Sequence, residues 1–248
     1  MKAVISGYGR MGHEVERVLT RRGHEIVSRI DPQPGVGDYD AADAQRLAGA
    51  DVVIEFADGA SVLQNARAYA DAGIAAVVGT TGWERDRAAV EETVAKAGIG
   101  YLIGANFSIG ANLFMRIAEE TARLVNRIPE YDLLIHEAHH RHKKDSPSGT
   151  ALTLGNKVLA QVDRKDTLAT EVLHRAIEAN ELQISSVRGG NIPGTHRITL
   201  DSEADTIEVS HVARNRSGFA LGAVMAAEWV REQRGFLTVD DFLADLLK

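Results

Sequence analysis

Residues 3–12 read AVISGYGRMG and decide the fold of the N-terminal part of the chain. A short apolar run typical of a buried strand leads into Gly7, Gly9 and Gly12, which fit the pattern G-x-G-x-x-G, and apolar residues then recur at helical spacing. In such a turn the first glycine allows a tight bend, the second lets a pyrophosphate approach the backbone, and the third lets helix and strand pack closely. Free N–H groups at the start of the helix bind phosphate oxygens. The sequence therefore predicts a dinucleotide site at this turn.

The kind of dinucleotide is indicated by Asp31, which ends a second predicted strand over residues 24–30. It lies roughly 20 residues beyond the glycines, where a carboxylate binds a ribose hydroxyl of the cofactor. A carboxylate repels the 2′-phosphate of NADPH, so we expect NADH, and NADPH use stays possible because Arg29 lies close by in the sequence.

Strands and helices alternate through the first 105 residues. Strands are predicted at residues 3–5, 24–30, 51–56, 75–78 and 100–103, and helices after the glycine turn, at 61–72 and at 83–97, with one or two helical turns at most between the second and third strands. This alternation indicates βαβ units and a Rossmann-like, doubly wound parallel sheet. The loops at residues 79–82 and 105–108 follow strands, so we expect them at the carboxyl edge of the sheet beside the cofactor.

The pattern changes after residue 106. Helices are predicted at residues 112–125 and 148–162, the second with Ser148 as N-cap, and strands at 131–138, 182–187, 196–200 and 206–212. We expect an α+β domain with a mixed or antiparallel sheet over residues 107–216. Two further helices, at 218–232 and from about 238, are expected to pack back on the first part, so that residues 1–106 and 217–248 form the dinucleotide-binding domain.

Residues 137–152 read EAHHRHKKDSPSGTAL and concentrate titratable groups at the end of a predicted strand. Histidine exchanges protons near neutral pH, lysine binds carboxylates, and the helix that opens at residues 148–150 offers N–H groups to an anion. The segment predicts a site for a small dianionic substrate. A solvated basic loop is one alternative. The other is a metal site of His139, His140 and His142, but no carboxylate stands at a recognisable zinc spacing, and no metal is expected.

Composition limits the other partners. The net charge of −7 argues against nucleic acid, no apolar run is long enough to span a membrane, and the absence of cysteine excludes disulfides and thiolate chemistry. With no secretory signal in the first residues, we expect a cytoplasmic protein.

Four segments together resemble the dihydrodipicolinate reductase family, also called 4-hydroxy-tetrahydrodipicolinate reductases. They are residues 7–12 (GYGRMG), 137–152, 188–196 (RGGNIPGTH) and 210–223 (SHVARNRSGFALGA). The resemblance implies an oxidoreductase that reduces 4-hydroxy-tetrahydrodipicolinate to tetrahydrodipicolinate with NAD(P)H and loss of water, in the diaminopimelate route to lysine. It also implies a homotetramer joined through the sheet of the substrate-binding domain, which would make residues 107–216 the oligomerisation domain as well.

The resemblance also assigns site residues. His139 matches the family's proton donor and acceptor, and Lys143 its second catalytic proton donor. The substrate-carboxylate binders are matched by His140, Gly149 and Thr150. The cofactor-binding positions are matched by Gly7, Tyr8, Gly9, Arg10, Met11, Gly12, Asp31, Gly79, Thr80, Thr81, Ala105, Asn106, Phe107 and Ser108.

Two departures and two rival readings remain. The chain is shorter than many family members between its second and third strands, and Pro32 stands where some relatives have a basic residue. The second departure favours NADH over NADPH.

Another two-domain dehydrogenase would also contain the glycine turn, but that function would not explain residues 137–152. A non-catalytic NAD-binding sensor would bind the cofactor without turnover. Spacing alone does not decide which histidine moves the proton.

Overall fold

The computed structural model describes residues 1–247. Its contacts divide the chain into two compact units, one of residues 1–109 together with the C-terminal segment from Arg216, the other of Gly110–Asn215. Among residues 1–247, no helix combines the length and the apolar character that crossing a bilayer would require.

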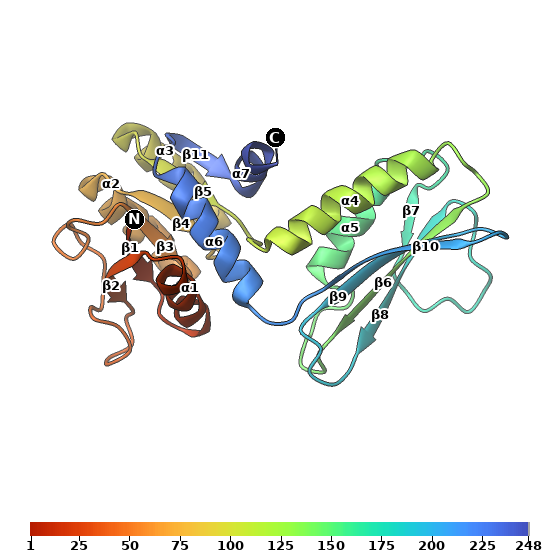
Figure 1. The fold of residues 1–248 in the computed structure, drawn as a ribbon, viewed down its shortest axis with the longest axis horizontal. Coiled ribbons are helices and arrows are strands. Elements are labelled where there is room, and N and C mark those ends of the chain that lie inside the picture. The colour runs from red at the N-terminus through yellow and green to blue at the C-terminus, as the bar shows by residue number, and fades with distance from the viewer. Residues whose placement is uncertain (248) are drawn as a thin grey trace. The chain divides into compact units, whose positions relative to one another are not determined.

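The first unit is built on a six-stranded sheet in the order β11-β5-β4-β3-β1-β2, in which every pair is parallel (Figure 1). The strands are β1 (Lys2–Ser6), β2 (Glu25–Ile30), β3 (Val52–Glu55), β4 (Ala75–Val78), β5 (Gly100–Ile103) and β11 (Gly235–Thr238). The strand order reverses between β1 and β3. In doubly wound sheets the carboxyl ends of the two strands at such a reversal flank the ligand-binding crevice. The predicted Rossmann-like sheet is confirmed.

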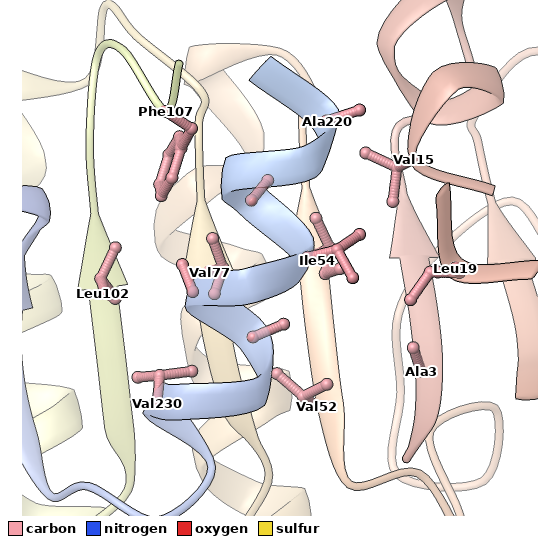
Figure 2. Packing of buried hydrophobic residues seen from close by; sticks show 14 of the residues in the cluster. Ala3, Val15, Leu19, Val52, Ile54, Val77, Leu102, Phe107, Ala220 and Val230 are labelled. Carbon is pink, nitrogen blue, oxygen red and sulfur yellow. The ribbon is translucent and has the colours of Figure 1, made fainter. Parts of the chain in front are cut away.

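Helices cover both faces of this sheet. They are α1 (Arg10–Arg21), α2 (Val62–Ala72), α3 (Arg87–Ala97), α6 (Ser217–Val230) and α7 (Val239–Leu246), with short 3-10 turns at Gly59–Ser61 and Glu84–Asp86. Side chains of α1 and α6 pack with Ile54, Val77 and Leu102 in one apolar cluster (Figure 2). Val53, one residue from Ile54, packs with α2 and α3 in a second cluster, as the alternation of a strand requires. Helix α6 therefore packs against the sheet that the first part of the chain forms.

One strand of this unit was missed. The sixth strand, β11, was not predicted, because its four half-buried residues directly precede helix α7 and show no alternation. It pairs with β5, and the rings of Phe236 and Tyr101 stack at 5.7 Å. Between β2 and β3 the chain forms a single turn, closed by a bond from the Leu47 N–H to the Asp43 carbonyl, which agrees with the expectation of one or two helical turns at most.

The second unit carries a five-stranded mixed sheet in the order β10-β9-β6-β8-β7. Its elements are α4 (Ile109–Val125), β6 (Asp132–His139), α5 (Gly149–Leu159), β7 (Thr167–Ala169), β8 (Glu181–Arg188), β9 (Thr195–Asp201) and β10 (Thr206–Val212). The central strand β6 pairs parallel with β8 and antiparallel with β9, which confirms the mixed sheet. The three-residue strand β7 was missed, being too short to show a period.

Helices α4 and α5 cover one face of this second sheet (Figure 1). Leu133 and Ile135 of β6 belong to the apolar cluster under these helices. Since side chains alternate along a strand, Glu137 and His139 lie on the same face, at the end of β6 beside the start of α5. The two titratable side chains therefore lie at the end of β6, on the face of the sheet that the helices cover.

Candidate active site

The glycine turn after β1 has the geometry that a dinucleotide requires. Gly7 has a φ of 85°, and a Cβ there would lie 2.1 Å from the Phe56 carbonyl oxygen, so no other residue fits. A Cβ on Gly12 would lie 2.4 Å from the Gly7 oxygen. A Cβ on Gly9, in contrast, would meet nothing within 4 Å. Gly9 is the N-cap of α1 and no side chain caps that helix, so the first N–H groups remain open to a pyrophosphate.

Asp31 is held beside this turn by two backbone bonds. Its Oδ2 accepts from the Tyr8 N–H at 2.8 Å and its Oδ1 from the Gln33 N–H at 2.9 Å. The carboxylate is thereby fixed at the end of β2, next to the glycines, and each oxygen still has a lone pair for a ribose hydroxyl.

Arg29, the cation that left NADPH open as a cofactor, already has two carboxylate partners. Its guanidinium lies 2.5 Å from Glu16 Oε1 and 3.4 Å from Asp38 Oδ2, and 5.6 Å above the ring of Tyr8. The hydrogen bond with Glu16 raises the pKa of Arg29 above its ordinary value. A cofactor phosphate would have to compete with both carboxylates for this side chain.

The other two predicted cofactor loops meet in the structure. Thr80 and Thr81, after β4, line a cavity of about 130 Å³ together with Ala105, after β5. Thr81 and Ala105 are exposed, whereas the side chain of Phe107 belongs to the apolar cluster under α6. Phe107 would therefore meet a ligand only through its backbone. The N–H of Ser108 donates to Asn106 Oδ1 at 2.9 Å, which shapes the loop ahead of α4.

In the second unit, strand register brings four titratable groups together. Glu137 on β6 stands opposite His196 on β9, and His139 on β6 stands opposite Arg188 on β8. Glu137, His139 and His196 are buried, and the Arg188 side chain is 18% exposed. Three neighbouring strands thus supply one polar cluster at one end of the sheet.

Glu137 is the centre of this cluster. Its Oε2 accepts a hydrogen bond from His139 Nδ1, and its Oε1 accepts from Arg188 Nη2 at 2.7 Å and from the Ser148 N–H at 3.2 Å. Because the carboxylate requires a proton on Nδ1, the Nε2 atom of His139 is left as the site that exchanges protons. His196 Nε2 lies 3.2 Å from Ser148 Oγ, and its ring packs edge-on at 5.1 Å from that of His139.

The ionisation of the cluster follows from burial and pairing. Although burial opposes its charge, hydrogen bonds from Arg188 and His139 lower the pKa of Glu137. Burial lowers the pKa of His139, outweighing the opposite effect of Glu137. Burial also lowers the pKa of His196 to about 4, so this ring is neutral at neutral pH. The site therefore holds one fixed anion beside an imidazole of weakened basicity.

The predicted substrate-binding residues surround this cluster. Lys143 is half-buried and its Nζ lies 2.9 Å from Asp145 Oδ1, an ion pair that lowers the pKa of Asp145. Gly149 and Thr150 form the first turn of α5, and Ser148 caps that helix by accepting from the Ala151 N–H, as predicted. His140 directly follows β6 and is half-buried. Cations and open N–H groups thus stand beside the His139 imidazole, as a dicarboxylate requires.

One set of potential metal ligands exists among residues 1–247, and it differs from the histidine trio weighed above. Glu137, His139 and His196 offer ligand atoms within 4.8 Å of one another. Each oxygen of Glu137 already accepts a hydrogen bond, and the Arg188 guanidinium stands 2.7 Å from one of them. A cation there would face that positive charge, so this geometry fits a hydrogen-bond network better than a metal centre.

No role was predicted for Glu137, Arg188 or His196, although all three lie in the segments that resemble the family. The spacing of Glu137 and His139, two residues apart on a strand, places them on one face and was a usable signal. The contributions of Arg188 and His196 depend on the register of β8 and β9 against β6, which one sequence does not reveal.

Comparison with known proteins agrees over both units. Residues 1–107 match the family model described as dihydrodipicolinate reductase, N-terminus, and residues 110–243 match the one described as dihydrodipicolinate reductase, C-terminus. A 4-hydroxy-tetrahydrodipicolinate reductase of Christiangramia forsetii is 37% identical over 248 residues, the whole of both chains. One of Archaeoglobus fulgidus is 35% identical over 266 aligned positions that cover 98% of this chain and all of that protein.

A solved structure shares the fold. It is a dihydrodipicolinate reductase from Paenisporosarcina sp. TG-14 with dipicolinate bound, and it superposes with a TM-score of 0.76 at 22% identity, covering 96% of this chain and 97% of that one. With both family models and full-length relatives in agreement, the chain belongs to the dihydrodipicolinate reductase family.

Proposed function

We propose that this chain reduces 4-hydroxy-tetrahydrodipicolinate to tetrahydrodipicolinate, in the diaminopimelate route to lysine. The ring accepts a hydride and a proton, and its hydroxyl leaves as water, while NAD(P)H becomes NAD(P)⁺. Curated relatives of full length carry the name of this activity. The observation that carries the proposal is the His139 imidazole, oriented by buried Glu137 and flanked by Lys143 and the open start of α5.

Each residue of the second unit has a proposed task. His139 exchanges the proton at Nε2, because Glu137 occupies Nδ1. Lys143 supplies positive charge and the second proton, after exchanging Asp145 for a substrate carboxylate of the same charge. His140 and the N–H groups of Gly149 and Thr150 bind the carboxylates, with the N-terminal end of α5 adding its positive dipole. Residues 107–216 would thus act as the substrate-binding domain.

NADH is the proposed cofactor, with NADPH as a second possibility, held by residues 1–106 and 217–248 as the dinucleotide-binding domain. When bound, it supplies the hydride. Gly7 to Gly12 would hold its pyrophosphate, Asp31 its ribose hydroxyl, and the loops at Gly79 to Thr81 and Ala105 to Ser108 the nicotinamide half. NADH is favoured because Asp31 is fixed beside the turn while Arg29 is occupied by two carboxylates.

The glycine turn allows a prediction that separates folding from cofactor binding. Gly9→Ala is expected to fold as the parent does, because its Cβ meets no protein atom, yet to weaken NADH binding by about tenfold or more, because the methyl group stands where the pyrophosphate approaches. Melting temperature and NADH titration by fluorescence measure the two effects.

Gly23→Ala is not a fair control, because Gly23 has a positive φ. Gln64→Ala, at an exposed position of α2, provides a control that leaves the turn untouched and is compatible with the helix. Unchanged NADH affinity in Gly9→Ala would show that the cofactor does not approach this turn.

The quaternary structure proposed is a homotetramer joined through the open face of the second sheet. Leu134, Val187 and Val212 lie on the face that α4 and α5 leave uncovered, with 39%, 47% and 60% of their surface exposed. A second copy of the chain would bury these apolar side chains. Light scattering tests the mass. A cytoplasmic location and the absence of nucleic-acid or membrane partners complete the proposal.

A coupled assay tests the function. Dihydrodipicolinate synthase generates the unstable substrate in place, and oxidation of NADH and NADPH is followed in parallel. Oxidation that depends on both enzymes, faster with NADH than with NADPH, is the expected result. NADH oxidation with another amino-acid or semialdehyde substrate alone would favour a different dehydrogenase, and cofactor binding without any turnover would favour a sensor.

A further inference from the structure

A fully buried carboxyl group lies at the carboxyl end of β3, apart from the groups assigned above. Glu55 is the last residue of a strand whose other three residues are valine or isoleucine, and its exposure is 0%. Val53, two residues earlier, packs under α2 and α3, so Glu55 also points to that face. An apolar residue is expected at such a position, because burying a carboxyl group is unfavourable unless hydrogen bonds stabilise it.

Every hydrogen bond of Glu55 comes from a neutral group. Its Oε2 accepts from the Tyr69 hydroxyl at 2.6 Å and from the Asn65 amide at 3.1 Å, both on α2. Its Oε1 accepts from the Thr80 hydroxyl at 3.2 Å. Within residues 1–247, no lysine, arginine or histidine is recorded as its partner. The remaining titratable neighbour is Tyr101 of β5, also buried.

Through Thr80, Glu55 connects two loops at the carboxyl edge of the first sheet. Thr80 Oγ1 accepts from the Ala57 N–H at 2.9 Å while donating to Glu55, so the loop after β3 is tied to the loop after β4. The loops also touch directly, since a Cβ on Gly59 would lie 2.7 Å from the Thr81 oxygen. The loop after β4 is one of those to which the cofactor is assigned.

We propose that Glu55 is a positioning residue that holds the loops of Ala57 and Thr80 in the geometry that receives the cofactor, and that it takes up a proton when the anionic dinucleotide binds. A neutral carboxyl group keeps its bonds to Thr80 and Tyr69, because it can donate one hydrogen bond and accept others. An ionised one places an uncompensated negative charge in the interior, beneath the loop of Thr80 to which the nicotinamide half of the anionic dinucleotide is assigned. Binding of an anion and binding of a proton therefore favour each other.

The ionisation of Glu55 agrees with this geometry. Burial raises the pKa of Glu55 to about 7, against the opposing effect of its three hydrogen bonds. Both protonation states are consequently populated near neutral pH, and NADH affinity is expected to fall as the pH rises through that value. The inference rests on the cofactor assignment but not on the substrate or on the roles of His139 and Lys143.

NADH titrations of the parent protein, Glu55→Gln and the exposed control Glu92→Gln, each between pH 6 and 8.5, test the inference. Glu55→Gln is neutral at every pH, and its amide accepts from Tyr69 and donates to Thr80. Between pH 6 and 8.5, the NADH affinity of the parent and of the control is expected to fall about fivefold more than that of Glu55→Gln. Equal pH dependence in Glu55→Gln and the parent would overturn the inference.

Infrared difference spectra of the cofactor-free proteins supply a second readout. The parent minus Glu55→Gln spectrum is expected to show a protonated carboxyl band that is lost as the pH rises through about 7. Absence of that band at pH 6 would overturn the inference even if NADH binds. Failure of the parent to bind NADH at any pH would instead overturn the cofactor assignment, and the proposed link to cofactor binding with it.

Discussion

Lys143→Ala is expected to lower kcat by about 10³-fold while NADH affinity stays unchanged, because the role proposed for this residue is to supply a proton and a charge to the substrate only. In the structure the ammonium group of Lys143 is paired with the carboxylate of Asp145. The proposed mechanism puts a carboxylate of the substrate in the place of Asp145. Removing the ammonium leaves the second unit without this cation next to His139. Single-turnover NADH oxidation with enzymatically generated substrate measures the loss.

Lys144→Ala is the matched control. Lys144 is the next residue in the chain, carries the same charge, and is exposed without a recorded partner among residues 1–247. The control should keep its activity within about threefold. Comparable activity in Lys143→Ala and Lys144→Ala would refute the catalytic role of Lys143 and favour the reading of residues 137–152 as a solvated basic loop.

Glu137→Gln is expected to reduce kcat by about 10²-fold or more with little change in NADH affinity. The substitution keeps size and removes the charge that fixes the proton on His139 Nδ1. It also places a neutral amide against Arg188, which is held by that carboxylate at 2.7 Å. Glu137→Ala, which leaves the Arg188 guanidinium without its anion, should further lower the free energy of unfolding by about 3 kcal/mol.

The pH profile distinguishes positioning from mere structural support. In the parent, Glu137 raises the pKa of His139 and burial, the larger effect, lowers it below 6.5. Removing the carboxylate charge leaves burial unopposed, so the pKa of His139 falls further. The limb of the kcat profile that follows loss of the His139 proton should therefore move to lower pH in Glu137→Gln.

Glu208→Gln serves as its control, since Glu208 lies on β10, is paired with Arg197, and is remote in register from Glu137. Its profile should match that of the parent. A Glu137→Gln enzyme with parental kcat and an unmoved profile would mean that the carboxylate does not orient the imidazole.

Much of the fold could be predicted because its signals are local. The glycine turn, Asp31 at the end of β2 and the alternating βαβ pattern each depend on neighbours within one element, and the structure has the expected sheet. Thr238 as the start of the last helix was recognisable for the same reason, and it forms a capping box with Asp241. Short elements such as β7 and β11 hold too few residues to show a period.

The candidate site was predictable only in part, because its remaining contacts are made across strands. His139 and Lys143 stood out as titratable residues in one segment. Arg188, which pairs with Glu137, and His196, which packs against His139, come from β8 and β9, some fifty residues further along the chain. Glu55 was overlooked for a different reason. It sits in a run that reads as an apolar strand, and its three donors come from α2 and from the loop after β4.

We propose direct transfer of a hydride from a nicotinamide dinucleotide to a cyclic dicarboxylate bound by the same chain. The most direct measurement uses NADH carrying deuterium at C4, substrate generated in place by dihydrodipicolinate synthase, and mass spectrometry of the product. Tetrahydrodipicolinate containing one deuterium atom, formed by the parent and about 10³-fold more slowly by Lys143→Ala, is the predicted result. NADH oxidation that leaves the product unlabelled with either stereoisomer of the deuterated cofactor, or no oxidation by the parent, would contradict the account.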